Sequence, residues 1–390
     1  MLRVGIVIQR YGKEVVGGAE TLAKDIAERL NASGADVTVF TTTAKDYITW
    51  ENFYKPGDSI LKGVQIKRFP VERQRDIENF NRYSQTFFNT EPGEREEMKW
   101  IIEQGPYSPA LIEGISRAQA NFDLFLFFTY LYYTTIAGMK VVEKPVVLFP
   151  TAHDEPPIYL NLMKEVFRRP EAILFLTGAE KQFVIKTFDP PGIPELVRTG
   201  MDISDNIAEN LFRRKHLQFA PYFLYAGRIE KGKGLELVFE AYGQVKKSRL
   251  IDFVLLGKKL MDIPEIDGLK YLGYVPEEEK LAAFKGAVFS VQPSHLESLS
   301  ITTLESFSQK TPVLVNKQCA VLQEHIDISG GGLSFENIDE FKQHFHTLYD
   351  NRKKSKQMGI KGFRYVEEYY AWEVVIAKIK DVLSKISGSS

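Results

Sequence analysis

Short apolar runs recur along this chain, and each is followed by a loop and a helix-length segment. The first run covers residues 4–8, and Leu22, Ile26 and Leu30 then recur at a spacing of four within residues 19–30. That spacing places the three side chains on one face of a helix. Gly34 stands where a helix C-cap is expected, and residues 36–41 form the next run. The order predicts a βαβ unit with parallel strands and a right-handed crossover.

The same pattern starts afresh in the second half, which predicts two domains. In the first half we expect further buried strands at residues 123–128, 146–149 and 172–176. The second series of runs covers residues 222–226, 252–256, 271–272, 287–291 and 312–315. A Pro- and Gly-rich stretch at 190–194 and a basic stretch at 213–216 separate the two series. We therefore expect a domain boundary near residues 190–220.

The predicted fold class is α/β, with two facing Rossmann-like, doubly wound domains. Such domains bind ligands at the carboxyl ends of their strands, so a cleft is expected there. A last helix over residues 360–386 is long enough to return to the first domain. We assign residues 1–198 to the first domain, 199–365 to the second and 366–390 to the returning helix. Residues 47–109 mix Pro, Gly, charge runs and aromatics, and are expected to be insertions and helices that decorate the first sheet.

Composition excludes several classes of protein. Hydrophobic residues make up 44% of the 390 residues, enough for a sizeable core. Fifty Lys and Arg against fifty-one Asp and Glu leave a charge of -1, so no global field favours nucleic acid. The single cysteine, Cys319, excludes an intramolecular disulfide and a Cys-rich zinc site. No leader or long apolar span is seen, so we expect a cytoplasmic protein, with peripheral attachment at the inner membrane face left open.

The most informative segment follows the apolar run at 287–291. With a helix beginning near Ser300, Glu297 lies in the preceding loop and Glu305 lies a little over one turn inside the helix. The backbone N–H groups of Leu299, Ser300 and Ile301 would then be unpaired, which makes a seat for phosphate oxygens. The carboxylates repel phosphate but accept hydrogen bonds from sugar or ribose hydroxyls. The alternative is an ordinary capped helix with two solvated glutamates.

A second segment, Gly227 to Gly234, crowds three glycines and several cations into one turn between a strand and a helix. Arg228 and Lys233 can converge on a diphosphate there, the former through bidentate bonds. The segment lacks the P-loop spacing, so it does not indicate ATP hydrolysis. An ordinary basic turn is the alternative reading.

Two further features belong to the first half. Gly17 and Gly18 precede the first helix, where adjacent glycines would let a phosphate or sugar approach the backbone, although a plain flexible turn has the same pattern. They lack the dinucleotide-binding fingerprint, which argues against a nicotinamide dehydrogenase. His153 follows the expected strand at 146–149 and could bond a sugar hydroxyl or be structural. No Asp-x-Asp pair occurs, so no metal is expected.

Together these segments resemble the retaining glycosyltransferases of family 4, which have the GT-B fold. Glu297 and Glu305 match the family's Glu-x7-Glu motif, Arg228 with Lys233 its phosphate-binding pair, and Gly17 with Gly18 its amino-terminal glycine loop. Further matches are the turn Gly200-Met201-Asp202, the dipeptide Pro312-Val313 and the aromatic segment Tyr370-Ala371-Trp372-Glu373. The resemblance covers nearly the whole chain.

The resemblance implies a metal-independent, retaining hexosyltransferase without a cofactor, using a UDP-sugar, with glucose as the hexose. The implied catalytic set is Glu297 at the sugar hydroxyls, His153 near the reacting carbon, and Arg228 with Lys233 at the diphosphate. Glu305 would hold the ribose, and the base would be read at Tyr274 and Val275. The acceptor, a carbohydrate or lipid-linked carbohydrate, would sit on the first domain. Polysaccharide biosynthesis is the implied process, and nucleic acid is not an expected partner.

Three segments depart from the family pattern. Ser298-Leu299-Ser300 replaces its Gly-Phe-Gly, Gln318-Cys319-Ala320 replaces its Gly-Gly, and residues 46–109 match nothing in it. Two alternative functions are a GT-B sugar-nucleotide epimerase or hydrolase, and a nucleotide-sugar-binding protein without turnover.

Overall fold

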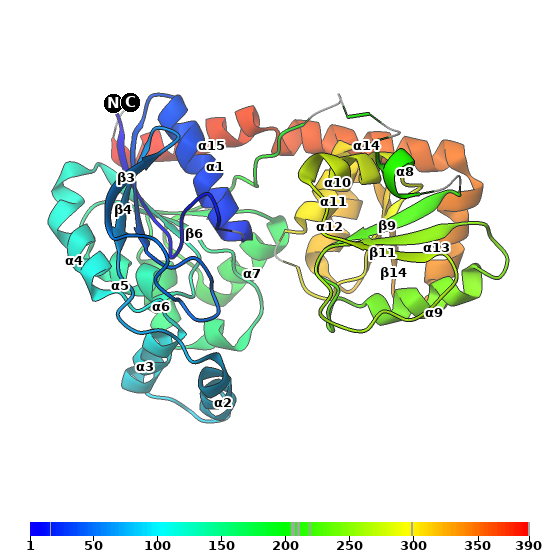
Figure 1. Cartoon of the computed structure of the whole chain (residues 1–390). Coiled ribbons are helices and arrows are strands. Elements are labelled where there is room, and N and C mark those ends of the chain that lie inside the picture. The colour runs from blue at the N-terminus through cyan, green and yellow to red at the C-terminus, as the bar shows by residue number, and fades with distance from the viewer. Residues whose placement is uncertain (16, 204–206, 209–210, 218–219, 298, 389–390) are drawn as a thin grey trace. The chain divides into compact units, whose positions relative to one another are not determined.

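The computed structural model of the chain describes residues 1–15, 17–203, 207–208, 211–217, 220–297 and 299–388 (Figure 1). It divides into two compact units. The first unit comprises Met1–Gly200 and Val375–Ser390, and the second comprises Met201–Val374. The sequence placed the first boundary two residues earlier, at 198/199.

The first unit is an eight-stranded sheet in the order β3-β4-β2-β1-β5-β6-β7-β8. Its strands are β1 (Arg3–Val7), β2 (Asp36–Thr42), β3 (Gly57–Leu61), β4 (Val64–Phe69), β5 (Leu124–Phe128), β6 (Val146–Phe149), β7 (Ala172–Phe175) and β8 (Ile193–Leu196). All neighbours pair in parallel except β3 and β4, which are antiparallel. The chain order along the sheet reverses between β1 and β5, so the doubly wound switch point lies there.

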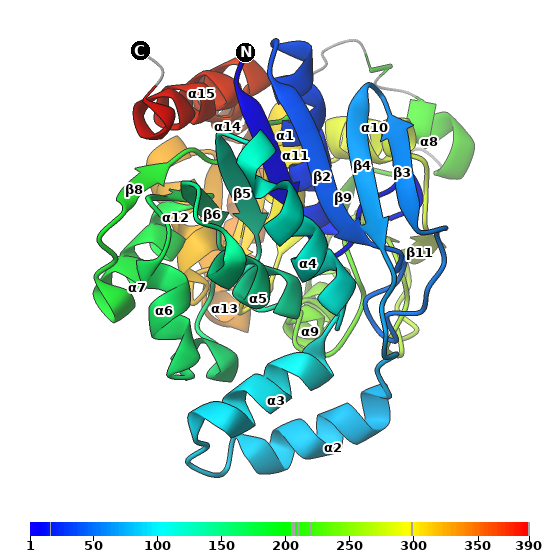
Figure 2. The same ribbon diagram turned by 90° about the vertical axis from the view of Figure 1, so that its left-hand side faces the viewer.

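Helices cover this sheet and extend beyond it. They are α1 (Gly18–Ala32), α2 (Ile77–Phe87), α3 (Glu94–Gln104), α4 (Pro109–Ala118), α5 (Tyr133–Val141), α6 (Leu162–Arg168) and α7 (Gly178–Phe188), with short 3-10 turns at Gln119–Asn121 and Pro156–Tyr159. Figures 1 and 2 both show α2 and α3 as a pair that extends beyond the sheet. The buried indole of Trp50 fixes this region by donating to the Gln104 carbonyl at 2.7 Å.

The second unit is a six-stranded, wholly parallel sheet in the order β11-β10-β9-β12-β13-β14. Its strands are β9 (Tyr222–Ala226), β10 (Asp252–Leu256), β11 (Leu269–Gly273), β12 (Ser290–Gln292), β13 (Val313–Asn316) and β14 (Gly332–Phe335). Its helices are α8 (Leu211–His216), α9 (Leu235–Val245), α10 (Glu277–Gly286), α11 (Ile301–Ser308), α12 (Ala320–Ser329), α13 (Ile338–Asp350) and α14 (Arg352–Tyr370). Here the order reverses between β9 and β12, which is the second switch point.

The predicted fold class is confirmed, with three local corrections. The insertion at 47–109 contains strands β3 and β4 as well as helices, and both strands join the sheet. Strands β8 and β14 were also not predicted. The long helix expected at 360–386 is two helices, α14 and α15 (Trp372–Ser387), because Ala371 leaves the helical conformation and forms a bridge with Met201.

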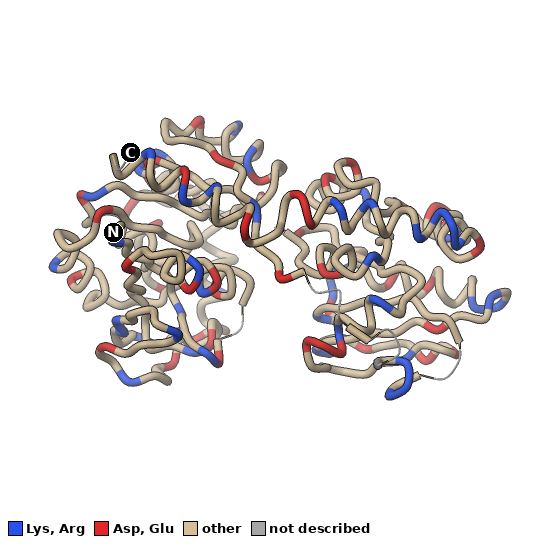
Figure 3. The backbone as a smooth tube through the Cα atoms, turned by 90° about the horizontal axis from the view of Figure 1, so that it is seen from above, with Lys and Arg blue, Asp and Glu red and all other residues tan. Residues whose placement is uncertain are grey.

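Charged residues of both signs are mixed along the chain. Figure 3 shows Lys and Arg interleaved with Asp and Glu along both units, in keeping with the net charge of -1. Any preference for an anion must therefore arise in a local site.

Candidate active site

Two loops meet at the switch point of the second unit. One connects β9 to α9 and ends at Gly234, and the other connects β12 to α11 and begins at Pro293. Gly234 has a φ of +72°, and a Cβ atom there would lie 2.2 Å from the Pro293 carbonyl oxygen. Only glycine allows this backbone conformation together with such a close approach. The loop with the predicted phosphate-binding residues and the loop with the predicted sugar-binding residue are therefore packed directly against each other.

Lys233 and Glu297 join these loops through an ion pair. The Lys233 Nζ donates to Glu297 Oε1 at 2.7 Å, and the side chains are 21% and 17% exposed. Arg228 is more exposed, at 55%, and its Nη2 lies 3.1 Å from Glu230 Oε1. Each predicted phosphate-binding cation thus faces a carboxylate. The shared grip of Arg228 and Lys233 on one diphosphate stays a prediction.

The helix that follows has the predicted arrangement. Helix α11 begins at Ile301, one residue after the expected start, so that Glu297 lies in the loop and Glu305 inside the helix. Ser300 has a left-handed φ of 59°, and its Oγ lies 2.9 Å from Thr303 Oγ1. Within the described residues, no acceptor is bonded to the N–H of Leu299, Ser300 or Ile301. Ser298, the first residue of the departure from the family pattern, lies outside the described residues.

A buried histidine supports this helix start. His325 on α12 is fully buried, and its Nε2 is 2.7 Å from the Leu299 carbonyl oxygen. Its Nδ1 is 3.1 Å from the Tyr365 hydroxyl on α14. This contact ties α12 to the Leu299 carbonyl, two residues before α11 begins. Sequence reasoning missed His325 because nothing in its own segment indicates a contact with residue 299.

Glu305 is a buried carboxylate with one unpaired oxygen. Its Oε1 accepts from Lys280 Nζ at 2.8 Å, while its buried Oε2 has no hydrogen-bond partner among the described residues. Burial raises the pKa of Glu305 to about 7, and the ammonium of Lys280 opposes that rise. This unpaired acceptor suits a hydroxyl donor. Its predicted contact with a ribose stays a prediction.

The predicted base-reading turn follows β11. Tyr274 is 89% exposed, whereas Val275 is buried. Gly273 has a positive φ of 71°. Its carbonyl accepts a hydrogen bond from the N–H of Gly257 at 2.8 Å. That bond ties the turn to the loop after β10. Recognition of a base at Tyr274 and Val275 stays a prediction.

In the first unit, the two adjacent glycines have different surroundings. A Cβ atom on Gly17 would lie 2.2 Å from the Glu20 Oε2, whereas Gly18 has open space around it. Glu20 forms a buried ion pair with Arg10, whose Nη2 lies 2.5 Å from Glu20 Oε1, and Gln9 also donates to that oxygen at 2.9 Å. Gly17 is thus required by packing against this pair, while Gly18 leaves its backbone accessible. Arg10, in the loop after β1, and Glu20, on α1, were given no role by the sequence reasoning.

His153 lies in the loop after β6, as expected, and is held by a neighbouring carboxylate. Its Nε2 is 3.3 Å from Glu155 Oε2, and the Tyr130 hydroxyl donates to Glu155 Oε1 at 2.6 Å. The hydrogen bond to Glu155 raises the pKa of His153, against the effect of burial. Burial would raise the pKa of Glu155, but the bonds from His153 and Tyr130 hold it below its usual value. The pair favours a positively charged imidazole.

A second carboxylate, that of Glu180, also holds the loop that contains His153. Glu180 is buried at the start of α7 and accepts from the N–H groups of Ala152 at 2.7 Å and Leu176 at 2.9 Å. Burial raises its pKa to about 7. Sequence reasoning missed Glu180 because a glutamate in a first helical turn is usually solvated.

The described residues contain neither a metal-binding cluster nor a membrane-spanning helix. No three His, Cys, Asp or Glu side chains gather among them in an arrangement that could hold a metal ion. Nor does any helix in the described part of the chain combine the length and apolar character that crossing a membrane demands.

Comparison with known proteins places this geometry in a family context. Residues 208–365 match the family model for glycosyl transferases group 1. The whole chain resembles sucrose-phosphate synthase from Thermosynechococcus elongatus, with a TM-score of 0.75 at 15% identity over 100% of both chains. It also resembles HepE from Anabaena in complex with UDP and glucose, with a TM-score of 0.70 at 14% identity over 99% of this chain and 100% of that chain.

A third similar structure is α,α-trehalose 6-phosphate synthase from Burkholderia multivorans, with a TM-score of 0.72 at 11% identity. The match covers 100% of this chain and 97% of that one. Identities this low establish the fold, and the family match lies almost wholly in the second unit. The second unit is thus similar to the glycosyl transferases group 1 model over residues 208–365, and the chain as a whole has the GT-B fold.

Proposed function

We propose that this protein transfers a hexose from a nucleotide diphosphate sugar, UDP-glucose, to a carbohydrate or lipid-linked carbohydrate acceptor, with retention of configuration and without a metal. The family match of the second unit supports the transferase activity. The similarity to HepE, described as bound to UDP and glucose, supports the choice of donor. Retention follows the resemblance of the Glu297 and Glu305 motif to family 4.

The observation that carries the proposal is the Lys233–Glu297 ion pair beside the start of α11. Without a ligand the two charges satisfy each other at 2.7 Å. A diphosphate offers Lys233 a stronger, doubly charged partner. The N–H groups of residues 299–301, which have no acceptor among the described residues, offer the diphosphate further hydrogen bonds. Glu297 is then released and accepts hydrogen bonds from hydroxyls of the transferred sugar. A ligand that has both a diphosphate and a sugar thus gives Lys233 and Glu297 one partner each.

The same groups account for the chemistry. Breaking the bond between the anomeric carbon and the leaving phosphate builds negative charge on that phosphate. Arg228, Lys233 and the α11 amides stabilise this charge electrostatically, without a metal. The leaving phosphate takes the acceptor proton as the acceptor attacks from the same face of the sugar, which gives retention. His153, whose protonated form Glu155 favours, contributes a hydrogen-bond donor near the sugar.

Calorimetric titration with UDP and then UMP tests the phosphate site. We expect Arg228→Ala to weaken UDP binding by about tenfold or more, because a charged hydrogen bond is lost, while UMP binding changes less. Lys231→Ala is the matched control, because this exposed lysine lies in the same loop between Arg228 and Lys233, the two residues proposed to bind the diphosphate. Unchanged UDP affinity in Arg228→Ala would contradict the phosphate role.

Turnover separates the transferase from its alternatives. UDP-glucose is incubated with a panel of acceptors, and products are followed by NMR of the anomeric proton. An α-linked product supports retention, and an unchanged rate in EDTA supports independence of a metal. Glucose or an epimer without transfer would favour the hydrolase or epimerase. Tight UDP binding with no product of any kind would favour the non-catalytic binding protein.

A further inference from the structure

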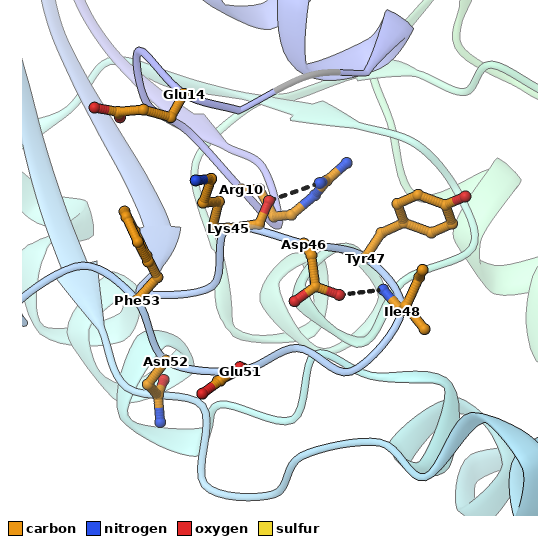
Figure 4. A pocket seen from close by; sticks show the side chains of 9 residues that line it. All are labelled: Arg10, Glu14, Lys45, Asp46, Tyr47, Ile48, Glu51, Asn52 and Phe53. Atoms are coloured by element: carbon orange, nitrogen blue, oxygen red, sulfur yellow. Dashed lines mark hydrogen bonds between the residues drawn. The ribbon is translucent and has the colours of Figure 1, made fainter. Parts of the chain in front are cut away.

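A hollow of about 390 Å³ opens in the first unit between the loops that follow β1 and β2. Its size falls within the range of small-ligand pockets, roughly 300–1,000 Å³. Figure 4 shows that Glu14 and Arg10 reach it from the first loop, and that Lys45, Glu51 and Phe53 reach it from the second. Both loops lie at the carboxyl ends of strands, where doubly wound sheets bind ligands. We call this hollow the β1–β2 pocket.

The walls of the β1–β2 pocket are fixed by contacts between the two loops. The Tyr54 hydroxyl donates to Glu14 Oε2 at 2.8 Å, and a Cβ atom on Gly12 would lie 2.3 Å from that hydroxyl. Arg10 Nη1 donates to the Lys45 carbonyl at 2.8 Å, which is one of the dashed contacts in Figure 4. Asp46 accepts from the N–H groups of its own turn, at Ile48 and Thr49. The pocket is therefore preformed.

The charges facing this pocket are mainly negative. Three carboxylates line it, those of Glu14, Asp46 and Glu51, against Lys45 and Arg10. Arg10 is already paired with the buried Glu20. Lys45 Nζ lies 4.4 Å from the centre of the Phe53 ring. The hydrogen bond from Tyr54, and to a smaller extent the charge of Lys45, hold the pKa of Glu14 below its usual value. A phosphate group entering here would meet more negative than positive charge.

Other features of the lining suit a sugar ring. Phe53 is 57% exposed and Tyr47 is 48% exposed. A cation lies over each ring, Lys45 at 4.4 Å from the centre of Phe53 and Arg10 at 5.4 Å from the centre of Tyr47, so a ligand can pack only against the ring surface that these cations leave exposed. Among the described residues, the Glu51 carboxylate has no hydrogen-bond partner. Carboxylates accept hydrogen bonds from hydroxyls, and aromatic rings bury the C–H face of a ring. The lining combines the two requirements of an uncharged carbohydrate.

A second hollow in the first unit is also lined by more negative than positive charge. It measures about 460 Å³, and its described lining includes Asp154, Glu155 and Tyr159 but no lysine or arginine. It adjoins His153, whose Nε2 lies 3.3 Å from Glu155 Oε2. Negative charge is thus common to both pockets on the rim of this sheet.

We propose that the β1–β2 pocket is the acceptor subsite and takes an unphosphorylated sugar, whose ring lies against Phe53 and Tyr47 and whose hydroxyls donate to Glu51. The word acceptor rests on the proposed function. The chemistry of the pocket does not, because it follows from the lining side chains alone. The pocket therefore discriminates against sugar phosphates.

Saturation-transfer NMR on the full chain tests the pocket, with UDP present and aromatic protons irradiated. The probes are methyl α-glycosides of glucose, galactose and mannose, each paired with the corresponding hexose 6-phosphate. We expect at least one glycoside to bind about tenfold more tightly than its phosphorylated counterpart, because like charges oppose the phosphate. Phe53→Ala should reduce the saturation received by that glycoside several-fold.

A charge reversal provides the matched comparison. Glu51→Lys should reduce the ratio of glycoside affinity to hexose 6-phosphate affinity by about tenfold, because it replaces a charge that repels phosphate with one that attracts it. Glu143→Lys, at an exposed position outside the pocket lining, should leave the preference unchanged. Equal or tighter binding of the phosphates, no binding of any probe, or no effect of Phe53→Ala would each overturn the pocket assignment.

The two proposals fail in different measurements. Absence of UDP binding and of UDP-glucose turnover would end the proposed function, and with it the description of the pocket as an acceptor subsite. UDP binding with transfer to hexose phosphates in preference to hexoses would leave the transferase standing and overturn the present inference.

Discussion

The close contact between Gly234 and Pro293 leads to a prediction that separates packing from backbone strain. Gly234→Ala places a Cβ atom 2.2 Å from the Pro293 carbonyl oxygen, whereas contacts of real Cβ atoms essentially never fall under 3.0 Å. The oxygen cannot move away freely, because the Asn316 side chain donates to it at 3.0 Å. The β9–α9 loop must therefore shift, and it carries Lys233 with it.

The expected cost has two parts. A left-handed conformation at a residue with a Cβ atom costs about 1–2 kcal/mol, and Gly234 has a φ of +72°. Overpacking against a held group adds about 1–3 kcal/mol. The same loop provides the control, because Gly232 has a φ of +90° and open space around it. Gly232→Ala should show only the first part.

Urea unfolding followed by circular dichroism measures both variants, and calorimetry measures their affinity for UDP. We expect Gly234→Ala to be about 1–3 kcal/mol less stable than Gly232→Ala, the difference being the overpacking alone. UDP binding should also weaken more in Gly234→Ala, because Lys233 is displaced. Equal midpoints for the two variants would refute the inferred contact between the loops.

Two other predictions concern buried carboxylates of the first unit. Because burial raises the pKa of Glu180 from 4.5 to about 7, the folded state favours its protonated form; the contribution of Glu180 to stability should be fully present below pH 4.5 and should be lost as the pH rises to 7. The loss at Glu180 is at most about 3 kcal/mol, and melting curves of Glu180→Gln should show a smaller fall than wild type over the same pH range. Glu97 on α3 is buried and accepts from the backbone N–H groups of Asn161 and Leu162, each at 2.9 Å. Glu97→Ala leaves these donors unpaired and should cost about 2–4 kcal/mol in urea unfolding, and a loss under about 0.5 kcal/mol would contradict the anchoring role.

The strands that the sequence predicted best are those buried on both faces. Strands β6, β9 and β10 begin and end at the predicted residues, because buried parallel strands form continuous apolar runs. Strand β3, with the sequence Gly57 to Leu61, is mostly exposed and lacks such a run. Strand β8 contains Pro194, which an edge position tolerates but which reads as a linker.

The candidate site divides in the same way. The loops that carry Arg228, Glu297 and His153 could be predicted, since each follows an apolar strand and so lies at a carboxyl end. The partners of these groups could not, because they come from distant parts of the chain. Lys233 and Glu297 are 64 positions apart, and no local pattern relates them. The burial of Glu97 could not be predicted, because this residue belongs to a charged run at residues 94–97 and its backbone partner Leu162 lies on the distant α6.

The break at Ala371 has a consequence for how the protein can be divided. The chain enters the second unit at Met201 and leaves it after Val374, so that unit is inserted into the first. Met201 donates its N–H to the Tyr370 carbonyl at 2.7 Å, which holds the incoming and outgoing segments side by side. A fragment ending at residue 200 would lack the last helix, whose Ile379 and Leu383 are fully buried. The first unit is thus complete only when both ends of the polypeptide are present, and excising residues 201–374 leaves two cut ends that a short linker can rejoin.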